Sequence, residues 1–132
     1  MGTVRQAEME GLPSPRGFLF VEAPAFSRHR EKLLDDDGLR ELQRALAAHP
    51  DAGAVVPGAG GVRKLRWKDT RRGQGKRGGL RILYYCFLSE GEIWLLTLYG
   101  KNEASDLSSD EKVQLRQALE AERAARKQAR QP

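Results

Sequence analysis

The sequence predicts one α+β domain whose elements follow in the order β-α-α-β-β-β-α. Three observations predict this class. Short runs of β-branched and aromatic residues are separated by a segment of helical periodicity, two apolar runs are joined by three residues ending in glycine, and a helix-capping signature lies near the C-terminus. A chain of 132 residues is long enough for one small core. We expect the domain to span residues 18–126.

The two ends of the chain are expected to lie outside this domain. Residues 1–17 are polar and rich in glycine and proline, which predicts a disordered leader. They lack the apolar core of a signal peptide, and no window reaches the roughly 18 apolar residues of a membrane span. Residues 127–132 are expected to be a frayed tail. Together these features favour a cytoplasmic protein.

The first half of the domain is predicted to be one strand followed by two helices. Residues 18–23 are β-rich and stop at Pro24, and a helix is expected over residues 25–34. One of the aspartates at 35–37 can cap the next helix. That helix carries an apolar stripe at helical spacing and ends at Pro50; its members are Leu39, Leu42 and Leu46.

The next segment is predicted to be a basic strand and a long loop. A glycine-rich linker at 51–61 leads into residues 62–67, where alternation places Leu65 and Trp67 on one face and Lys64 and Arg66 on the other. Residues 68–79 then form a 12-residue basic loop, a length that is usually functional or mobile.

Two apolar strands are predicted at 80–88 and 92–99, central in the sheet because they are apolar on both faces. We expect a three-residue hairpin with Gly91 in the left-handed conformation. Pairing Leu88 with Glu92 sets Arg81 directly opposite Tyr99, on the same face. Shifting the register by one residue would put the two side chains on opposite faces.

The last helix is expected to open with the capping box of Ser108 and Glu111 and to run to about Arg126. The chain has a single cysteine, Cys86, which excludes a disulfide framework and a metal site made of several cysteines. Because it lies in an apolar strand, we interpret it as a buried, inert thiol. No metal or cofactor is expected.

Positive charge is concentrated in one part of the chain. Residues 61–101 contain ten Lys and Arg against three acids, a formal charge of +7, whereas the whole chain carries +5. Such a concentration is typical of a polyanion site, although solvated surface charge is the alternative interpretation. With a pI near 9.7, nucleic acid is the first partner to test.

Lysine, arginine and tyrosine without histidine can bind a phosphate backbone and stack a base. They could also cleave RNA, which needs a base for the 2′-hydroxyl, cations for the charge on the phosphorane and an acid for the leaving 5′-oxygen. Arginine stabilises phosphate charge bidentately. A Lys or Tyr crowded by cations can transfer protons if its pKa falls towards neutrality.

Three motifs in this order resemble the HigB branch of the RelE/ParE toxin superfamily over about residues 18–120. They are Gly-Gly-Val-Arg-Lys-Leu-Arg-Trp (60–67), Gly-Lys-Arg-Gly-Gly-Leu-Arg-Ile-Leu-Tyr-Tyr (75–85) and Leu-Leu-Thr-Leu-Tyr-Gly-Lys-Asn-Glu (95–103). The resemblance implies the RelE-type microbial RNase fold, a small, mainly antiparallel four-stranded sheet flanked by helices. It also implies a ribosome-dependent mRNA endonuclease, the toxin of a type II toxin–antitoxin pair, with a helix-turn-helix antitoxin encoded nearby.

The resemblance also assigns roles by position. Lys64 and Arg66 would bind and orient the scissile phosphate, Arg81 would stabilise the transition state and Tyr99 would stack on or position the nucleotide. Lys101 would assist proton transfer or contact phosphate. The expected contacts to RNA are Arg63, Arg71, Arg72, Lys76 and Arg77. The leader and Arg71-Arg72 depart from the family pattern.

Two other functions stay open at this point. A protein of the related ParE branch would poison DNA gyrase and would need no RNA-cutting residues, against which the predicted face of Lys64, Arg66, Arg81 and Tyr99 argues. A degenerate RNA-binding module would bind without cleaving. A supercoiling assay tests the first, and mRNA cleavage in the presence of ribosomes tests the second.

Overall fold

The computed structural model describes residues 3–4, 17–69, 76–100 and 108–130, with the backbone alone at 3–4 and 76–78. Three α-helices and six strands form in these residues, which confirms the α+β class. In chain order they are β1 (Thr3–Val4), β2 (Leu19–Glu22), α1 (Pro24–Leu33), α2 (Asp36–Ala48), β3 (Ala54–Val55), β4 (Arg63–Asp69), β5 (Lys76–Phe87), β6 (Glu92–Gly100) and α3 (Ser109–Ala129).

The described strands form one sheet in the order β1-β2-β6-β5-β4-β3. The four expected strands are β2, β4, β5 and β6, and β5 and β6 are central as predicted. The expected strand number and order need correction, because the two-residue strands β1 and β3 extend the sheet at its edges. The sheet is also mixed: β2 pairs in parallel with β6, whereas the other described pairings are antiparallel. Strands of two residues leave no periodic pattern in a sequence.

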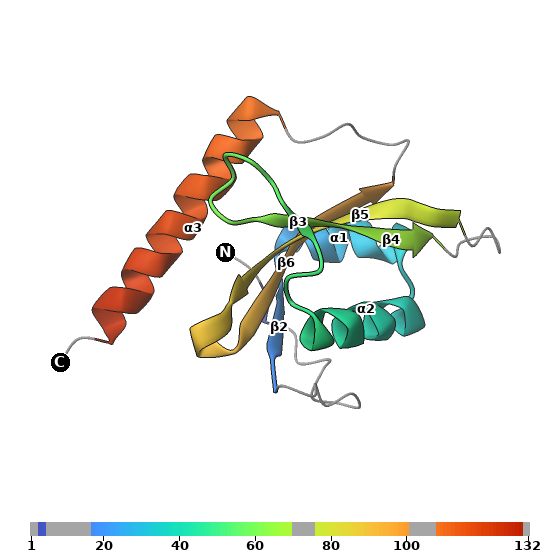
Figure 1. Ribbon diagram of the computed structural model, residues 1–132, viewed down its shortest axis with the longest axis horizontal. Helices are drawn as coiled ribbons and strands as arrows, with labels where there is room; N and C mark the ends of the chain where they lie inside the picture. The colour runs from blue at the N-terminus through green and yellow to red at the C-terminus, as the bar shows by residue number, and fades with distance from the viewer. Residues whose placement is uncertain (1–2, 5–16, 70–75, 101–107, 131–132) are drawn as a thin grey trace.

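The helices cover the two faces of the sheet unequally. Helices α1 and α2 lie on one side and α3 on the other (Figure 1). The core beneath α1 and α2 is built around Phe20, Phe26, Leu42, Ile82 and Leu95. A second, smaller cluster on the opposite face includes Leu83, Phe87, Trp94 and Leu119 of α3.

The boundaries of α2 follow from local signals in the sequence. The Asp35 carboxylate accepts a hydrogen bond from the Gly38 amide at 2.7 Å and so caps α2. The predicted stripe of Leu39, Leu42 and Leu46 is buried.

Helix α3 begins at the predicted capping box of Ser108 and Glu111 but continues to Ala129. The helix therefore includes residues 127–129 of the segment that was expected to be a frayed tail. Ion pairs from the last turns of the helix to the β5–β6 hairpin hold this end.

Both ends of the predicted loop at 68–79 are strand. Strand β4 continues to Asp69 and β5 begins at Lys76, and these two residues pair across the ladder. Residues 70–75 lie outside the described part of the chain. The expected leader also lies outside it apart from β1, which pairs with the edge of β2, and Gly17. In the described residues, no helix combines the length and the apolar composition needed to cross a membrane.

The β5–β6 register agrees with the prediction at one end and departs from it at the other. Arg81 lies opposite Tyr99, as predicted, but the register shifts by one residue between Leu83 and Tyr84. Phe87, not Leu88, therefore lies opposite Glu92. The turn contains a 3-10 helix at Leu88–Glu90, and Gly91 adopts the predicted left-handed conformation with φ 69°.

The shift is a β-bulge in β6. Leu83 pairs with Thr97 while the next residue, Tyr84, pairs with Leu95. Leu96 is therefore the extra residue on the bulged strand.

The bulge changes which residues of β6 face α1 and α2. Before it, Ile93 and Leu95 pack in the core beneath these helices. Regular alternation would continue with Thr97, but Leu98 takes the next place in this core instead. Tyr99 packs against the cluster on the opposite face. The bulge therefore turns Tyr99 to the face that α3 partly covers.

Candidate nucleic-acid interface

Three neighbouring strands bring four of the predicted residues to one face of the sheet. Arg66 on β4 pairs with Arg81 on β5, and Arg81 pairs with Tyr99 on β6. Directly opposed residues share a face, so these three side chains form a row across the sheet. Lys64 lies two residues before Arg66 and therefore on the same face. We call Lys64, Arg66, Arg81 and Tyr99 the basic row.

Alternation in β4 explains why the row faces away from α1 and α2. Leu65 and Trp67 pack against the core beneath these helices. Lys64 and Arg66 consequently project from the other side of the strand. In β5 the same alternation buries Leu80 and Ile82 and turns Arg81 to the basic row.

The members of the row differ in exposure. Arg66 is exposed, whereas Lys64 and Arg81 are partly buried. One guanidinium nitrogen of Arg81 donates to its neighbour's carbonyl, Leu80 O, at 3.3 Å. Tyr99 packs against the second core cluster, and its hydroxyl oxygen is buried. The Tyr99 ring is therefore better placed for contact with a ligand than the hydroxyl.

A cavity of about 250 Å³ adjoins the basic row. It shares Lys64 and Tyr99 with the row and has further walls from the β3 segment, β5 and α3. Its lining residues are Ala54, Val55, Val56, Pro57, Lys64, Leu83, Tyr99 and Lys112. Sequence reasoning missed Lys112 and the β3 residues, because Lys112 is one of many charges on α3 and β3 is too short to predict.

The segment that supplies one wall of the cavity is fixed to the sheet. The Gly53 amide donates to the Tyr84 hydroxyl at 2.8 Å, and this hydroxyl donates to Pro50 O at 2.7 Å. Burial raises the pKa of Tyr84, although the bond from Gly53 acts in the opposite direction, so the phenol stays protonated at neutral pH. It can then serve as donor and acceptor at once.

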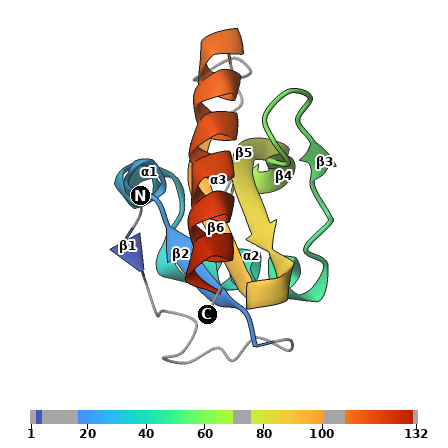
Figure 2. The ribbon, with the colours of Figure 1, turned by 90° about the vertical axis from the view of Figure 1, so that its left-hand side faces the viewer.

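Further along this segment, two arginines of α3 hold its turn. Arg116 donates to Gly58 O at 3.2 Å and Arg123 donates to Gly60 O at 3.3 Å. Gly60 has a φ of 74°, and a Cβ there would lie about 3.0 Å from Arg116 Cγ. Figure 2 shows the β3–β4 segment curling along one side of α3. The helix and the turn therefore position each other.

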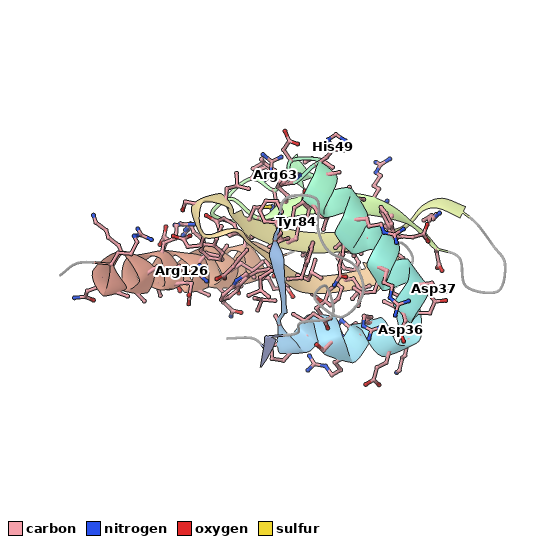
Figure 3. All side chains as sticks on the ribbon, turned by 90° about the horizontal axis from the view of Figure 1, so that it is seen from below. Asp36, Asp37, His49, Arg63, Tyr84 and Arg126 are labelled. Atoms are coloured by element: carbon pink, nitrogen blue, oxygen red, sulfur yellow. The ribbon has the colours of Figure 1, made fainter. Side chains whose placement is uncertain are left out.

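Arg63 does not belong to the basic row, and its expected contact with RNA stays a prediction. It pairs with Tyr84 and so lies on the face of α1 and α2. Its guanidinium donates to Gly53 O at 2.6 Å and to Asp51 O at 3.2 Å, and Figure 3 shows it near Tyr84 and the end of α2. These contacts make Arg63 a structural residue that fastens the segment before β3.

The other predicted cations cannot be placed on the interface. Arg71, Arg72 and Lys101 lie outside the described residues. Lys76 and Arg77 belong to the first part of β5, where the backbone alone is described. Their roles in contacting RNA stay predictions.

Both histidines belong to the side of the molecule formed by α1 and α2. His29 of α1 reaches the edge of β6, where its Nδ1 lies 3.2 Å from Leu98 O and 3.3 Å from Thr97 Oγ1. His49 is the C-cap of α2. Among the described residues, no three His, Cys, Asp or Glu side chains are grouped as metal ligands.

Arg126 anchors α3 over the far end of the same sheet face. Its guanidinium contacts Glu92 at 2.7 Å and Glu122 at 2.8 Å, and lies 3.9 Å from the centroid of the Phe87 ring. Figure 3 shows Arg126 between α3 and the strands. Burial of Glu92 disfavours its charge, but hydrogen bonds from Arg126 and the Trp94 indole outweigh this, so the pKa of Glu92 is lowered.

No protein-family model matches the sequence. What the site does is therefore inferred from its own residues. Three cations from two adjacent strands and an aromatic ring on the third suit a phosphodiester with an attached base. Arg66 and Arg81 are like charges directly opposed across the β4–β5 ladder.

Proposed function

We propose that the protein is a ribosome-dependent mRNA endonuclease, the toxin of a type II toxin–antitoxin system. The observation that carries the proposal is the pairing of Arg66 with Arg81 and of Arg81 with Tyr99. It gathers cations from distant parts of the sequence beside an aromatic ring. The same proposal includes the RelE-type fold and a helix-turn-helix antitoxin as partner. The three sequence motifs at 60–67, 75–85 and 95–103 also support it.

In the proposed reaction the 2′-hydroxyl of one nucleotide attacks the adjacent phosphorus and the 5′-oxygen of the next nucleotide leaves. The products are a 2′,3′-cyclic phosphate and a 5′-hydroxyl. Lys64 and Arg66 orient the phosphate and Arg81 stabilises the added charge of the phosphorane. Tyr99 positions the nucleotide through its ring. Base and acid are not assigned to single residues.

The test is cleavage of a defined mRNA by purified protein with and without programmed ribosomes. We expect new 5′ ends inside codons at the decoding site, only when ribosomes are present, and products with a 5′-hydroxyl. An mRNA that stays intact with active ribosomes over a wide range of protein concentration would overturn the proposal. A parallel gyrase supercoiling assay should show no inhibition; inhibition there would support the ParE-like alternative.

One observation favours a second candidate, an RNA-binding module that does not cleave. The Tyr99 hydroxyl is buried, so the row presents no phenol to a leaving oxygen. Its remaining members, Lys64, Arg66 and Arg81, suit binding of a phosphate backbone without cleavage. Ribosome binding without cleavage, under conditions in which translation initiates normally, would favour this candidate over the endonuclease.

A further inference from the structure

We propose that the cavity beside the basic row is a binding pocket for one nucleotide of single-stranded RNA. In this assignment the base enters between the β3 segment and the floor formed by Leu83 and Tyr99, and its phosphate lies against Lys64 and Lys112. The pocket assignment deepens the proposed function and rests on it for the identity of the natural substrate.

The chemistry of the lining selects the ligand class. Of its eight described residues, five are aliphatic, one is aromatic and two are lysines, and no carboxylate is among them. Aliphatic and aromatic walls suit a flat ring, and two ammonium groups suit an anion. A nucleotide combines both in one molecule.

The size of the cavity limits how much can enter. At about 250 Å³ it is smaller than the ~300–1,000 Å³ typical of pockets for drug-sized ligands. One base with its phosphate is therefore a better match than a dinucleotide or a folded RNA element. The remainder of the strand would continue outside the cavity.

The position of the cavity sets which nucleotide it would hold. Lys64 and Tyr99 belong both to the cavity and to the basic row. A phosphodiester at Arg66 and Arg81 would therefore be covalently attached to the nucleotide in the pocket. The pocket would thus determine the nucleotide preference at the cleavage site.

The walls are held in place before a ligand arrives. Gly53 is bonded to the Tyr84 hydroxyl, and the Val56 amide donates to Val62 O at 2.8 Å. Arg116 of α3 holds the turn that follows at Gly58, one residue beyond the cavity wall. Such preorganisation lowers the entropic cost of binding a small ligand.

The test begins with binding, without ribosomes or cleavage. The full-length protein is titrated with each of the four nucleoside 5′-monophosphates, with ribose 5-phosphate and with inorganic phosphate, while backbone amide NMR shifts are followed. We expect shifts at Val55, Val56 and Lys112 with nucleotides, at lower concentrations than with either phosphate control. Equal responses to nucleotides and inorganic phosphate would overturn the base-binding part.

Two variants and one matched control then locate the site. Lys112→Gln should weaken nucleotide binding about tenfold, the size of one charge-assisted contact. Ala54→Asp should do the same, because Ala54 pairs with Lys64 across the β3–β4 ladder and a carboxylate there would share the face of Lys64. Ala54 is exposed, so the fold should tolerate the change. Lys127→Gln removes an exposed charge of α3 outside the cavity and should bind like the unmodified protein.

The outcomes test the pocket assignment and the endonuclease proposal independently. If nucleotide binding depends on Lys112 but the protein never cuts mRNA, the pocket assignment would stand and the endonuclease proposal would be wrong. Cleavage with unchanged nucleotide preference in folded Lys112→Gln and Ala54→Asp would contradict the pocket assignment and leave the endonuclease proposal standing. If both proposals hold, these variants should cut with an altered preference at the nucleotide beside the scissile bond.

Discussion

Arg66 on β4 lies directly opposite Arg81 on β5. Opposed like charges destabilise a strand pair, typically by a few tenths of a kcal/mol to about 1 kcal/mol. A phosphate placed between them would turn this repulsion into two attractive contacts.

Arg81→Ala should reduce mRNA cleavage by roughly 10²-fold or more, by analogy with removing one preorganised donor to a developing negative charge. Ribosome binding, spread over more cations, should fall far less. The variant should still fold, because Arg81 lies near the end of the β5–β6 ladder, which begins at the Leu80–Gly100 pair. Cleavage on programmed ribosomes and thermal unfolding check this. A folded variant that cleaves at the unmodified rate would contradict the catalytic role.

Binding of single-stranded RNA should weaken steeply as salt increases. Each neutralised phosphate of a single strand contributes about −0.7 to the slope of log K against log salt. Lys64, Arg66 and Arg81 together should thus account for a slope of about −2. We expect Arg66→Gln to make the slope shallower by about 0.7 and Lys127→Gln to leave it unchanged. A nearly flat dependence from about 50 to 200 mM salt would exclude the basic row as the interface.

The sequence predicted the features that depend on local pattern. Asp35 and Ser108 cap the helices that follow them, and the alternation of Leu65 with Arg66 determines which side of β4 is buried. The pairing of Arg81 with Tyr99 was also predicted, but from an assumed regular ladder that pairs Leu88 with Glu92. The bulge at Leu96 shifts the residue pairs near the turn, and no residue type at this position predicts a bulge.

What the sequence did not predict depends on tertiary contacts. Arg63 and Arg66 are both arginines of one basic strand, and the sequence does not separate their roles. In the structure, Arg63 lies on the face opposite to the basic row and donates to the carbonyls of Asp51 and Gly53. The cavity is assembled from five separate segments, so its residues share no local pattern. Helix α3 extends beyond its expected end because its last turns pair with Glu90 and Glu92.

Arg126→Met should lower the free energy of unfolding by about 2 kcal/mol. It keeps a long apolar side chain at this position but removes the cation–π contact with Phe87 and the charged hydrogen bonds to partly buried partners. Arg130→Met, which loses an ion pair from a side chain that is 60% exposed, should cost less than about 1 kcal/mol. Urea unfolding at neutral pH compares the two. Equal losses would show that burial of the Arg126 ion pairs contributes nothing.

The same substitution should alter the response to acid. The pKa of Glu92 is lower in the folded protein than its ordinary value near 4.5, so this carboxylate stabilises the fold above that value. The contribution is lost as pH falls through the folded-state pKa. The stability difference between the unmodified protein and Arg126→Met should therefore shrink below about pH 4.5. A difference that is independent of pH would assign the effect to packing.

Cys86 should react slowly with alkylating reagents. Burial raises the pKa of its thiol to about 11, and the sulfur donates to Pro50 O at 3.6 Å. Only the thiolate is nucleophilic, so at pH 8 the folded protein should react about 100-fold more slowly than the unfolded chain. The rate of iodoacetamide labelling should increase about tenfold per pH unit below this pKa. Rapid labelling of folded protein at pH 8 would show a reactive thiol.

Two substitutions of Tyr99 distinguish the role of its ring from the role of its hydroxyl. Its hydroxyl is buried and its ring lines the cavity, so the ring should matter more than the hydroxyl. Tyr99→Phe should therefore cleave within a few fold of the unmodified rate. Tyr99→Ala should lose roughly 1–3 kcal/mol of RNA binding, the value of one base stacked on an aromatic side chain. Folding is checked for both by thermal unfolding. A folded Tyr99→Phe protein that binds RNA normally but has lost cleavage would instead make the hydroxyl a proton donor, and would require it to become exposed when RNA binds.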